Sequence, residues 1–349
     1  CFPSQNSCHC VGCVMTMKHS PLNTWYAVAT AHEVGRTPLA RQIVGGRIVV
    51  YRDSRGDAVV LGDRCVHRPV ALSDGRLEGD DIVAPVTGWR YAPDGRCVSV
   101  PTQREVPIGA AVRSYPVRED GSFVWVWAGE PGAATLRRPP ATDWLRDSTW
   151  ATFGSSWETN AGLRLLQDNF ADISHVAQVD AAIAPPVLSG TDLPPLDVSV
   201  TETSVAFSRQ FAPAHVGSWQ SQVMGLPEDG LFAQLEEGEF VAPGLWVDRW
   251  TVQADPERTF IFTHALTPIS DRITGHTWAV SRNFALGAAA QGTLFPIFDA
   301  YYRRVKAILE GMQSMIDTDG YDEGVGLAAD AALVQVRRIM DRLVADEAR

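Results

Sequence analysis

Cys65-Val66-His67 is followed, sixteen residues later, by the run Ala84-Pro85-Val86-Thr87-Gly88-Trp89-Arg90-Tyr91. The first segment offers a thiol and an imidazole two residues apart, a donor pair that suits a transition metal. The second segment offers fewer such donors. Ala84 has no donor atom, and the Thr87 hydroxyl is a poor ligand for a transition metal. Only the first of the two segments therefore carries both kinds of donor.

This stretch resembles the Rieske domain of ring-hydroxylating and O-demethylating oxygenase large subunits, in their vanillate demethylase-like branch. The spacing, Pro85, Gly88, Trp89 and Tyr91 fit the pattern, and Asp94-Gly95-Arg96-Cys97-Val98 resembles the turn and strand that follow. A Rieske centre holds one iron with two Cys and the other with two His. The resemblance therefore implies a Rieske fold in which Ala84 replaces the second Cys and Thr87 replaces the second His.

A second segment, residues 167–180, resembles the catalytic iron helix of the same oxygenases, which carries Asp-x-x-His-x-x-x-x-His and pairs with a later carboxylate. Asp172 and His175 match, whereas Asp180 occupies the position of the second His. Residues 306–310 resemble the run that follows the third ligand in the family, and this alignment places the position of that ligand at Val305. Four of the seven family ligands are thus replaced, and we predict that the protein carries neither a [2Fe-2S] cluster nor mononuclear iron, and no other metal.

Composition indicates an ordinary globular protein, with 349 residues, 45% hydrophobic and 20% charged residues. A net charge of -11 argues against nucleic acid and anionic membranes as partners. No apolar run approaches the roughly 20 residues that span a bilayer, so a soluble, cytoplasmic protein is expected.

Four of the six Cys fall in the first thirteen residues. Residues 1–20 are interpreted as a disordered or non-native leader and are excluded from fold reasoning.

Two domains are predicted in an α+β chain. Residues 21–130 read as short antiparallel strands separated by Gly-Gly, Arg-Gly-Asp and Asp-Gly turns, and residues 131–145 as a linker. Residues 146–349 are expected to form a helix-grip domain, of the START-like kind that the resemblance implies. Its expected elements are a strand at 150–158, a helix at 163–179, strands at 198–207, 244–252, 259–266 and 276–284, and helices at 294–315 and 329–347.

The resemblance also implies that Asp172, His175 and Asp180 project from one helix into a deep apolar cavity. Asp172 and His175 are three residues apart, so the carboxylate is expected to orient the imidazole and form an acid/base unit. A purely structural hydrogen-bonded pair is the competing interpretation. For Cys65 the competing interpretation is a small, half-buried hydrophobic residue. For His67 it is a residue that caps a turn.

Three functions remain open. The first is a metal- and oxygen-independent enzyme of cyclase or isomerase type, acting on a hydrophobic small molecule in secondary metabolism. The second is a non-catalytic partner subunit of an intact oxygenase paralogue. The third is a true oxygenase or demethylase with atypical ligands. The family resemblance implies a homotrimer, and the second hypothesis a hetero-oligomer.

Overall fold

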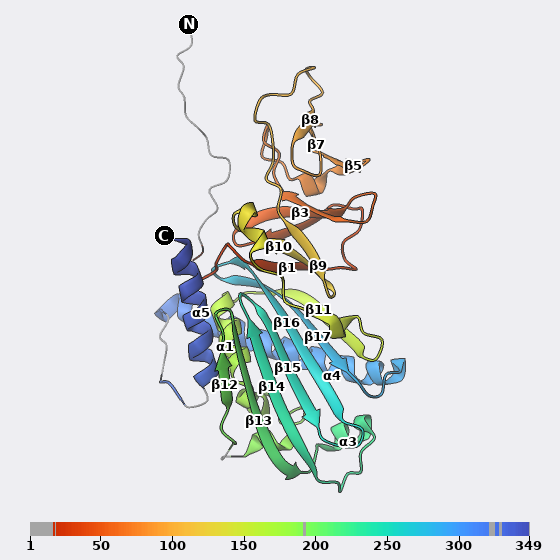
Figure 1. Cartoon of the computed structure of the whole chain (residues 1–349), viewed down its shortest axis with the longest axis vertical. Coiled ribbons are helices and arrows are strands. Elements are labelled where there is room, and N and C mark those ends of the chain that lie inside the picture. Colours follow the sequence, from red (N-terminus) through yellow and green to blue (C-terminus); the bar gives the residue numbers. More distant parts are fainter. Residues whose placement is uncertain (1–16, 18, 191–192, 321–324, 328–329, 349) are drawn as a thin grey trace.

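A region of short β-strands precedes a large antiparallel sheet in the computed structural model, which describes residues 17, 19–190, 193–320, 325–327 and 330–348 (Figure 1). Residues 1–16 and 18 of the predicted leader lie outside the described residues, whereas Met17 and Ser20 are described and buried. The first region contains three small sheets. They comprise β1 (Trp25–Thr30), β10 (Phe123–Trp127) and β9 (Val117–Asp120); β2 (Leu39–Ile43), β3 (Gly46–Arg52) and β4 (Ala58–Gly62); and β5 (Arg76–Glu78), β6 (Asp81–Val83), β7 (Arg90–Tyr91) and β8 (Cys97–Ser99).

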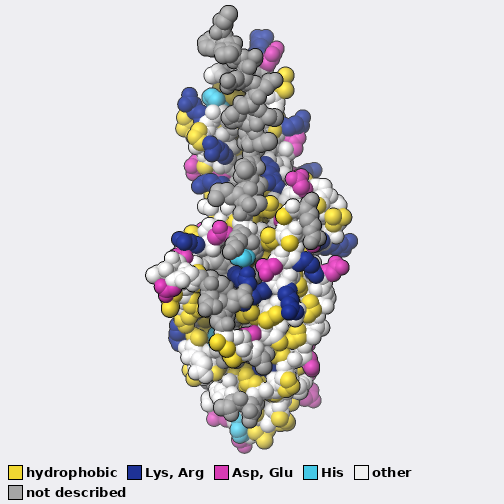
Figure 2. Space-filling model, turned by 90° about the vertical axis from the view of Figure 1, so that its left-hand side faces the viewer, with side chains coloured by type: hydrophobic (Ala, Val, Ile, Leu, Met, Phe, Trp, Pro, Cys, Tyr) yellow, Lys and Arg dark blue, Asp and Glu magenta, His cyan; other side chains and the backbone are white. Residues whose placement is uncertain are grey.

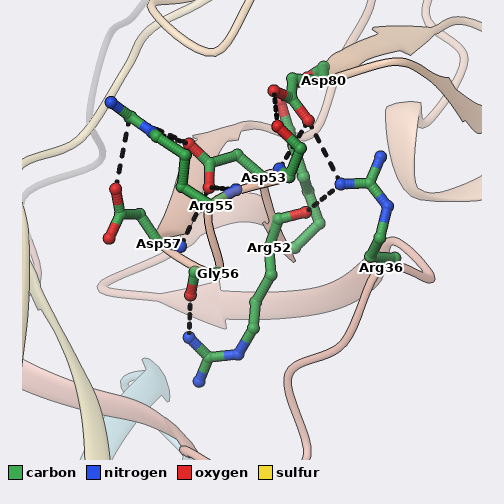
Figure 3. A network of polar contacts seen from close by, with 9 residues as sticks. Arg36, Arg52, Asp53, Arg55, Gly56, Asp57 and Asp80 are labelled. Atoms are coloured by element: carbon green, nitrogen blue, oxygen red, sulfur yellow. Dashed lines mark hydrogen bonds and ion pairs between the residues drawn. The ribbon is translucent and has the colours of Figure 1, made fainter.

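A polar network ties two hairpins of this region together (Figure 3). In the β3–β4 turn, the Asp53 carboxylate accepts the backbone N–H groups of Arg55 and Asp57, each at 2.9 Å, and also binds the Arg55 guanidinium. Asp80, in the β5–β6 turn, accepts a 2.7 Å hydrogen bond from the backbone N–H of Ser54 in the β3–β4 turn and a 3.2 Å hydrogen bond from Arg36. Such side-chain bonds to backbone N–H groups fix tight turns. The loops that follow β4 and β6, which carry Cys65 and Ala84, therefore start from anchored hairpins.

The second region is built on one seven-stranded antiparallel sheet in the order β11-β17-β16-β15-β14-β13-β12. Its strands are β11 (Ala151–Thr159), β12 (Asp197–Val200), β13 (Ser204–Ala214), β14 (Phe232–Val241), β15 (Leu245–Val252), β16 (Arg258–Ser270) and β17 (Ile273–Arg282). The helices are α1 (Leu163–Ala171), α2 (Val176–Val179), α3 (Ser218–Met224), α4 (Ala288–Asp319) and α5 (Ala331–Glu347). Over the two regions together, the short 3-10 turns are η1 (Leu72–Asp74), η2 (Pro131–Thr135), η3 (Asp143–Leu145), η4 (Ile173–His175) and η5 (Pro186–Ser189).

The main core lies between one face of this sheet and the helices α1, α4 and α5. Alternate residues of each strand point to this face, as the pleat requires. Helix α4 presents Phe298, Tyr302, Val305 and Leu309 to the sheet, at spacings of three and four residues that keep them on one side of the helix. The strand predicted at 198–207 is in fact a hairpin of β12 and β13, and β14 was not predicted.

The opposite face of the sheet packs on the first β region, which Figure 1 places directly above it. A shared apolar cluster includes Trp25 and Trp127 from the first region and Leu245 and Ile261 from the sheet. Burial of several large aromatic side chains makes this a substantial contact. At its margin, the Glu347 carboxylate near the end of α5 accepts the backbone N–H of Leu22 at 2.7 Å. The two regions are therefore joined by packing as well as by the chain.

Seen from the side of α5, acidic and basic side chains are interspersed over the surface, with hydrophobic side chains between them on the lower region (Figure 2). None of the helices in the described part of the chain combines the length and the apolar character needed to cross a membrane. The boundaries at 21–130, 131–145 and 146–349 remain a prediction.

Candidate active site

The loops after β4 and β6 meet at Cys65. This side chain is buried, and its Sγ lies 3.2 Å from the Tyr91 hydroxyl and 3.6 Å from the Thr87 hydroxyl. Burial works to raise the pKa of the Cys65 thiol, but hydrogen bonds from Tyr91, from neighbouring backbone N–H groups and from Thr87 outweigh it, so that the pKa is lowered. The structure thus brings Cys65 and Thr87 together.

His67 and Ala84 occupy the other two positions. His67 is exposed and stacks on Trp89, with ring centroids 5.0 Å apart and planes 12° from parallel. Ala84 is buried, and its backbone N–H and carbonyl bond to Trp89 and Gly88 at 2.8 and 3.1 Å. Of the four predicted positions, Cys65 and His67 carry the donor types of a Rieske centre.

The helix predicted at 163–179 is interrupted, so Asp172, His175 and Asp180 do not project from one helix. α1 ends at Ala171, and Asp172 has an extended backbone (φ -140°, ψ 108°) that breaks the helical hydrogen-bond series. His175 then ends η4, and Asp180 follows α2. Asp disfavours helix interiors because its side chain competes for backbone groups. The expected helical pairing of Asp172 with His175 is therefore wrong.

His175 is oriented by a backbone group instead. Its Nδ1 lies 2.6 Å from the carbonyl oxygen of Asp172. Because a carbonyl only accepts, Nδ1 must carry the proton and donate. Burial lowers the pKa of His175 and outweighs the opposing hydrogen bond and charge of Asp172, so the ring is neutral near pH 7. Its buried Nε2, which has no partner among the described residues, then presents a lone pair. Metal-binding histidines commonly donate their other ring N–H to a carbonyl in this way.

Asp180 and Val305 are less suited than His175 to donate an atom to a metal. The Asp180 carboxylate forms a 3.0 Å ion pair with Arg304 and accepts the backbone N–H of Ala182. Val305 is buried and lines the cavity described next. Asp299, a conceivable replacement donor, binds Arg303 at 2.7 Å, which neighbours Arg304 on α4. At the predicted iron position, His175 supplies a neutral nitrogen donor, Asp180 is engaged by Arg304, and Val305 supplies no donor atom.

A cavity of about 100 Å³ lies between α1, the η4–α2 segment, α4 and the sheet. Its walls are mostly apolar, and six of the residues that line it are the aromatic Phe170, Trp219, Trp250, Phe260, Phe262 and Phe298. His175 and Val305 border it, so the predicted iron position and the cavity coincide. Ligand sites in proteins are typically such concave, apolar spaces with a few polar groups.

Asp248 is one of these polar groups, and it was not predicted from the sequence. It lies in the middle of β15, it is buried, and its Oδ1 has no hydrogen-bond partner among the described residues. Burial raises its pKa well above the usual range, and the charge of Glu236 adds to this effect. The available signal was an acidic residue between Trp246 and Trp250, at an inward position of an otherwise apolar strand.

A second missed group joins two histidines and a tyrosine. His264 Nδ1 lies 3.1 Å from His276 Nε2, and the Tyr302 hydroxyl lies 3.5 Å from His264 Nε2. His264 borders the cavity and stacks on Phe170 at 4.1 Å between centroids. Burial lowers the pKa of His264 strongly, with the charge of His276 adding to it, and burial lowers that of His276 to about 3. Both rings are therefore neutral near pH 7.

With this geometry established, comparison with known proteins identifies the fold. Residues 159–346 match the family model of the vanillate O-demethylase oxygenase C-terminal domain, and residues 24–116 match the Rieske [2Fe-2S] domain. The chain belongs to the vanillate O-demethylase family of Rieske oxygenases. The resemblance predicted from Cys65 to Tyr91 and the α+β class are thereby confirmed.

Relatives in this oxygenase family match the chain over nearly its whole length. The vanillate O-demethylase oxygenase subunit of a Pseudomonas strain is 27% identical over 353 residues, covering 94% of this chain and 96% of that protein. The toluene-4-sulfonate monooxygenase system iron-sulfur subunit of Comamonas testosteroni is 26% identical, with coverages of 93% and 97%. A crystal structure of dicamba monooxygenase with 3,6-dichlorosalicylic acid shares the fold with a TM-score of 0.86 at 23% identity, covering 94% and 98% of the two chains.

The prediction that the chain has no cofactor is corrected by these findings. The N-terminal model is that of a [2Fe-2S] domain, and a structure of dicamba monooxygenase with the same fold holds non-haem iron. A [2Fe-2S] cluster and iron are the cofactors to which the comparisons point. Toward them, this chain offers Cys65 and His67 in the first loop and His175 Nε2 at the cavity, whereas Ala84 and Val305 add no donor atom. The relatives are named monooxygenases and demethylases, which gives no support to a cyclase or isomerase.

Proposed function

We propose that the chain is an oxygen-dependent enzyme, of the oxygenase or demethylase kind, that binds and oxidises a small, largely apolar aromatic molecule in the cavity beside His175. One observation carries the proposal: the cavity is lined by many aromatic rings and has the lone pair of a neutral His175 at its border. The names of the relatives support the reaction type.

The size and the lining of the cavity indicate what it holds. An apolar cavity of roughly 150 Å³ admits benzene, so a space of about 100 Å³ suits a single ring seated with small side-chain movements. Phe262 and Phe298, with centroids 5.6 Å apart, offer faces and edges for contact with such a ring. A two-ring ligand would need much larger displacement of the packed walls.

The residues of this chain have separable tasks in the proposed reaction. The aromatic walls exclude water and hold the ring. When bound, the family's cofactors supply electrons and activate oxygen. His175 would hold iron through Nε2, while the Asp172 carbonyl fixes the tautomer of His175. Cys65 and His67 are the side chains that would hold the cluster from the first loop.

A separate protein is proposed as the electron source, because the relatives are named as subunits or components of larger systems. The homotrimer, and the hetero-oligomer with an intact paralogue, remain predictions. The partner-subunit hypothesis would gain if the cavity bound no small molecule.

Toluene should bind the purified protein and quench its tryptophan fluorescence, because Trp219 and Trp250 line the cavity. Val305→Phe should weaken this binding at least tenfold, since Val305 is buried at the cavity wall and a ring there takes up the free space. The matched control is Ile308→Phe on the same helix, whose side chain is 44% exposed and should leave the affinity unchanged. Equal binding by both variants would place toluene elsewhere.

Oxidation of bound toluene should require oxygen and His175. After reduction with dithionite and mixing with ¹⁸O₂-saturated buffer, a hydroxylated product should carry ¹⁸O by mass spectrometry, and none should form under argon. Loss of a group that merely orients a metal ligand costs on the order of 10- to 100-fold, so His175→Ala should lower the yield at least as much. Product that forms equally under argon would reject an oxygen-dependent reaction.

A further inference from the structure

The cavity beside His175 is lined by polar as well as apolar side chains, but by no basic side chain among the described residues. None of the described residues that line it is Lys or Arg. Arg209, on the same face of the sheet two strands from Asp248, is bound to Glu236. Arg304, next to Val305, is bound to Asp180 and to the carbonyl of Val179. An anionic ligand would therefore find no countercharge in the described walls.

Burial favours the uncharged form of two titratable side chains that line the cavity, Asp248 and His264. Asp248 holds its proton because burial raises its pKa, with Glu236 adding to the effect. Burial lowers the pKa of His264, which favours its neutral form. A protonated carboxyl group in an apolar site is a hydrogen-bond donor. The unpartnered, buried position of Asp248 leaves that donor available to a ligand.

Desolvation then decides which ligands are accepted. Moving an ionised carboxylate from water into an apolar site costs far more than moving a neutral amide or ether, unless a cation receives it. A neutral acceptor, in contrast, gains a partner and satisfies a buried donor that otherwise has none. The cavity should discriminate by ligand charge.

We propose that this cavity selects uncharged single-ring aromatic ligands whose carbonyl or ether oxygen accepts a hydrogen bond from Asp248, and that it rejects aromatic carboxylates and sulfonates of the same shape. This specificity rests on the proposed function, since it names the substrate class of the same cavity. Asp248 is thereby a specificity-determining residue that contacts the ligand.

Calorimetric titration of the whole protein at pH 7.5 with benzamide, benzoate and toluene tests the proposal. Benzamide and benzoate have nearly the same shape and differ in charge, and toluene has no acceptor. Benzamide should bind at least tenfold more tightly than benzoate. Equal or tighter binding of benzoate, with toluene bound, would overturn the charge selection and leave the proposed function standing. Failure of all three ligands to bind would overturn both.

Variants of Asp248 separate its hydrogen bond from the shape of the cavity. Asp248→Leu should lower the affinity for benzamide about tenfold more than that for toluene, because both ligands meet the change of shape but only benzamide loses a donor. Removing an unpartnered buried polar group is not expected to prevent folding. Asp248→Asn, which keeps a donor, should retain benzamide binding to within a few fold. Benzamide affinity that is unchanged in Asp248→Leu would refute the role of Asp248.

Discussion

Arg209→Met should lower the free energy of unfolding by about 3–5 kcal/mol, because it leaves the carboxylate of Glu236 buried without its cation. Arg209 Nε lies 2.5 Å from Glu236 Oε2, and the two side chains are only 5% and 1% exposed. Burial raises the pKa of Glu236, while Arg209 opposes that rise. Urea titration followed by tryptophan fluorescence at pH 7.5 measures the loss.

Two controls identify the cause of that loss. Replacing both partners, in Arg209→Met with Glu236→Leu, should restore stability to within about 1 kcal/mol of the parent, since apolar pairs often replace buried ion pairs at little cost. The deficit of the single variant should also shrink as the pH falls toward 5, because the unpaired Glu236 then takes up a proton. A double variant as unstable as the single one would show that Arg209 acts by packing alone.

The same pair explains one failure of sequence-based prediction. Glu236, Glu237 and Glu239 give the β14 segment a solvated appearance, yet β14 lies inside the sheet, between β13 and β15. The inward position of Glu236 is tolerated because Arg209, 27 residues earlier in the chain, faces it across the strand pair. Sequence pattern alone does not contain that pairing.

The first β region was more accessible to prediction because its decisive features are local. The spacing from Cys65 to Tyr91, with turns such as Asp94-Gly95, specifies hairpins over a few residues. The helix interruption at Asp172 is also local, but it depends on the weak preference of Asp against helix interiors. The helical pattern of hydrophobic residues on either side of Asp172 obscures that preference. The prediction of a continuous helix therefore gave His175 the wrong partner, the Asp172 carboxylate instead of the Asp172 carbonyl.

The cavity group of Asp248, His264 and Tyr302 could not be assembled from the sequence. These residues come from β15, β16 and α4, and they converge only through the register of the sheet and the placement of α4 across it. Each is unremarkable in its own segment. Identifying polar residues at inward positions of apolar strands would have found Asp248 and His264, though not their common cavity.

The buried histidine pair should make the protein sensitive to acid, and this is the second large expected effect. The pKa of His276 falls to about 3 in the folded chain, and that of His264 is also strongly lowered. Unfolded chains bind protons on His near pH 6.5, so between pH 6.5 and about 3 the unfolded state binds more protons and stability falls as the pH falls. Each histidine contributes up to about 1.4 kcal/mol per pH unit in this window.

His276→Gln should therefore remove up to half of this histidine slope while keeping a polar side chain beside His264. Urea titrations at pH 7.5, 6.5, 5.5 and 4.5 measure the slope, and His32→Gln, at an exposed histidine, serves as the matched control. Asp248 and Glu236 act in the opposite direction, because their raised pKa values make the folded state bind protons more readily on acidification. The difference between His276→Gln and the parent isolates the histidine contribution, since both carboxyl groups are common to the two proteins. Parallel pH profiles for the parent and His276→Gln would show that His276 is protonated in the folded protein, which contradicts its burial between the helices and the sheet.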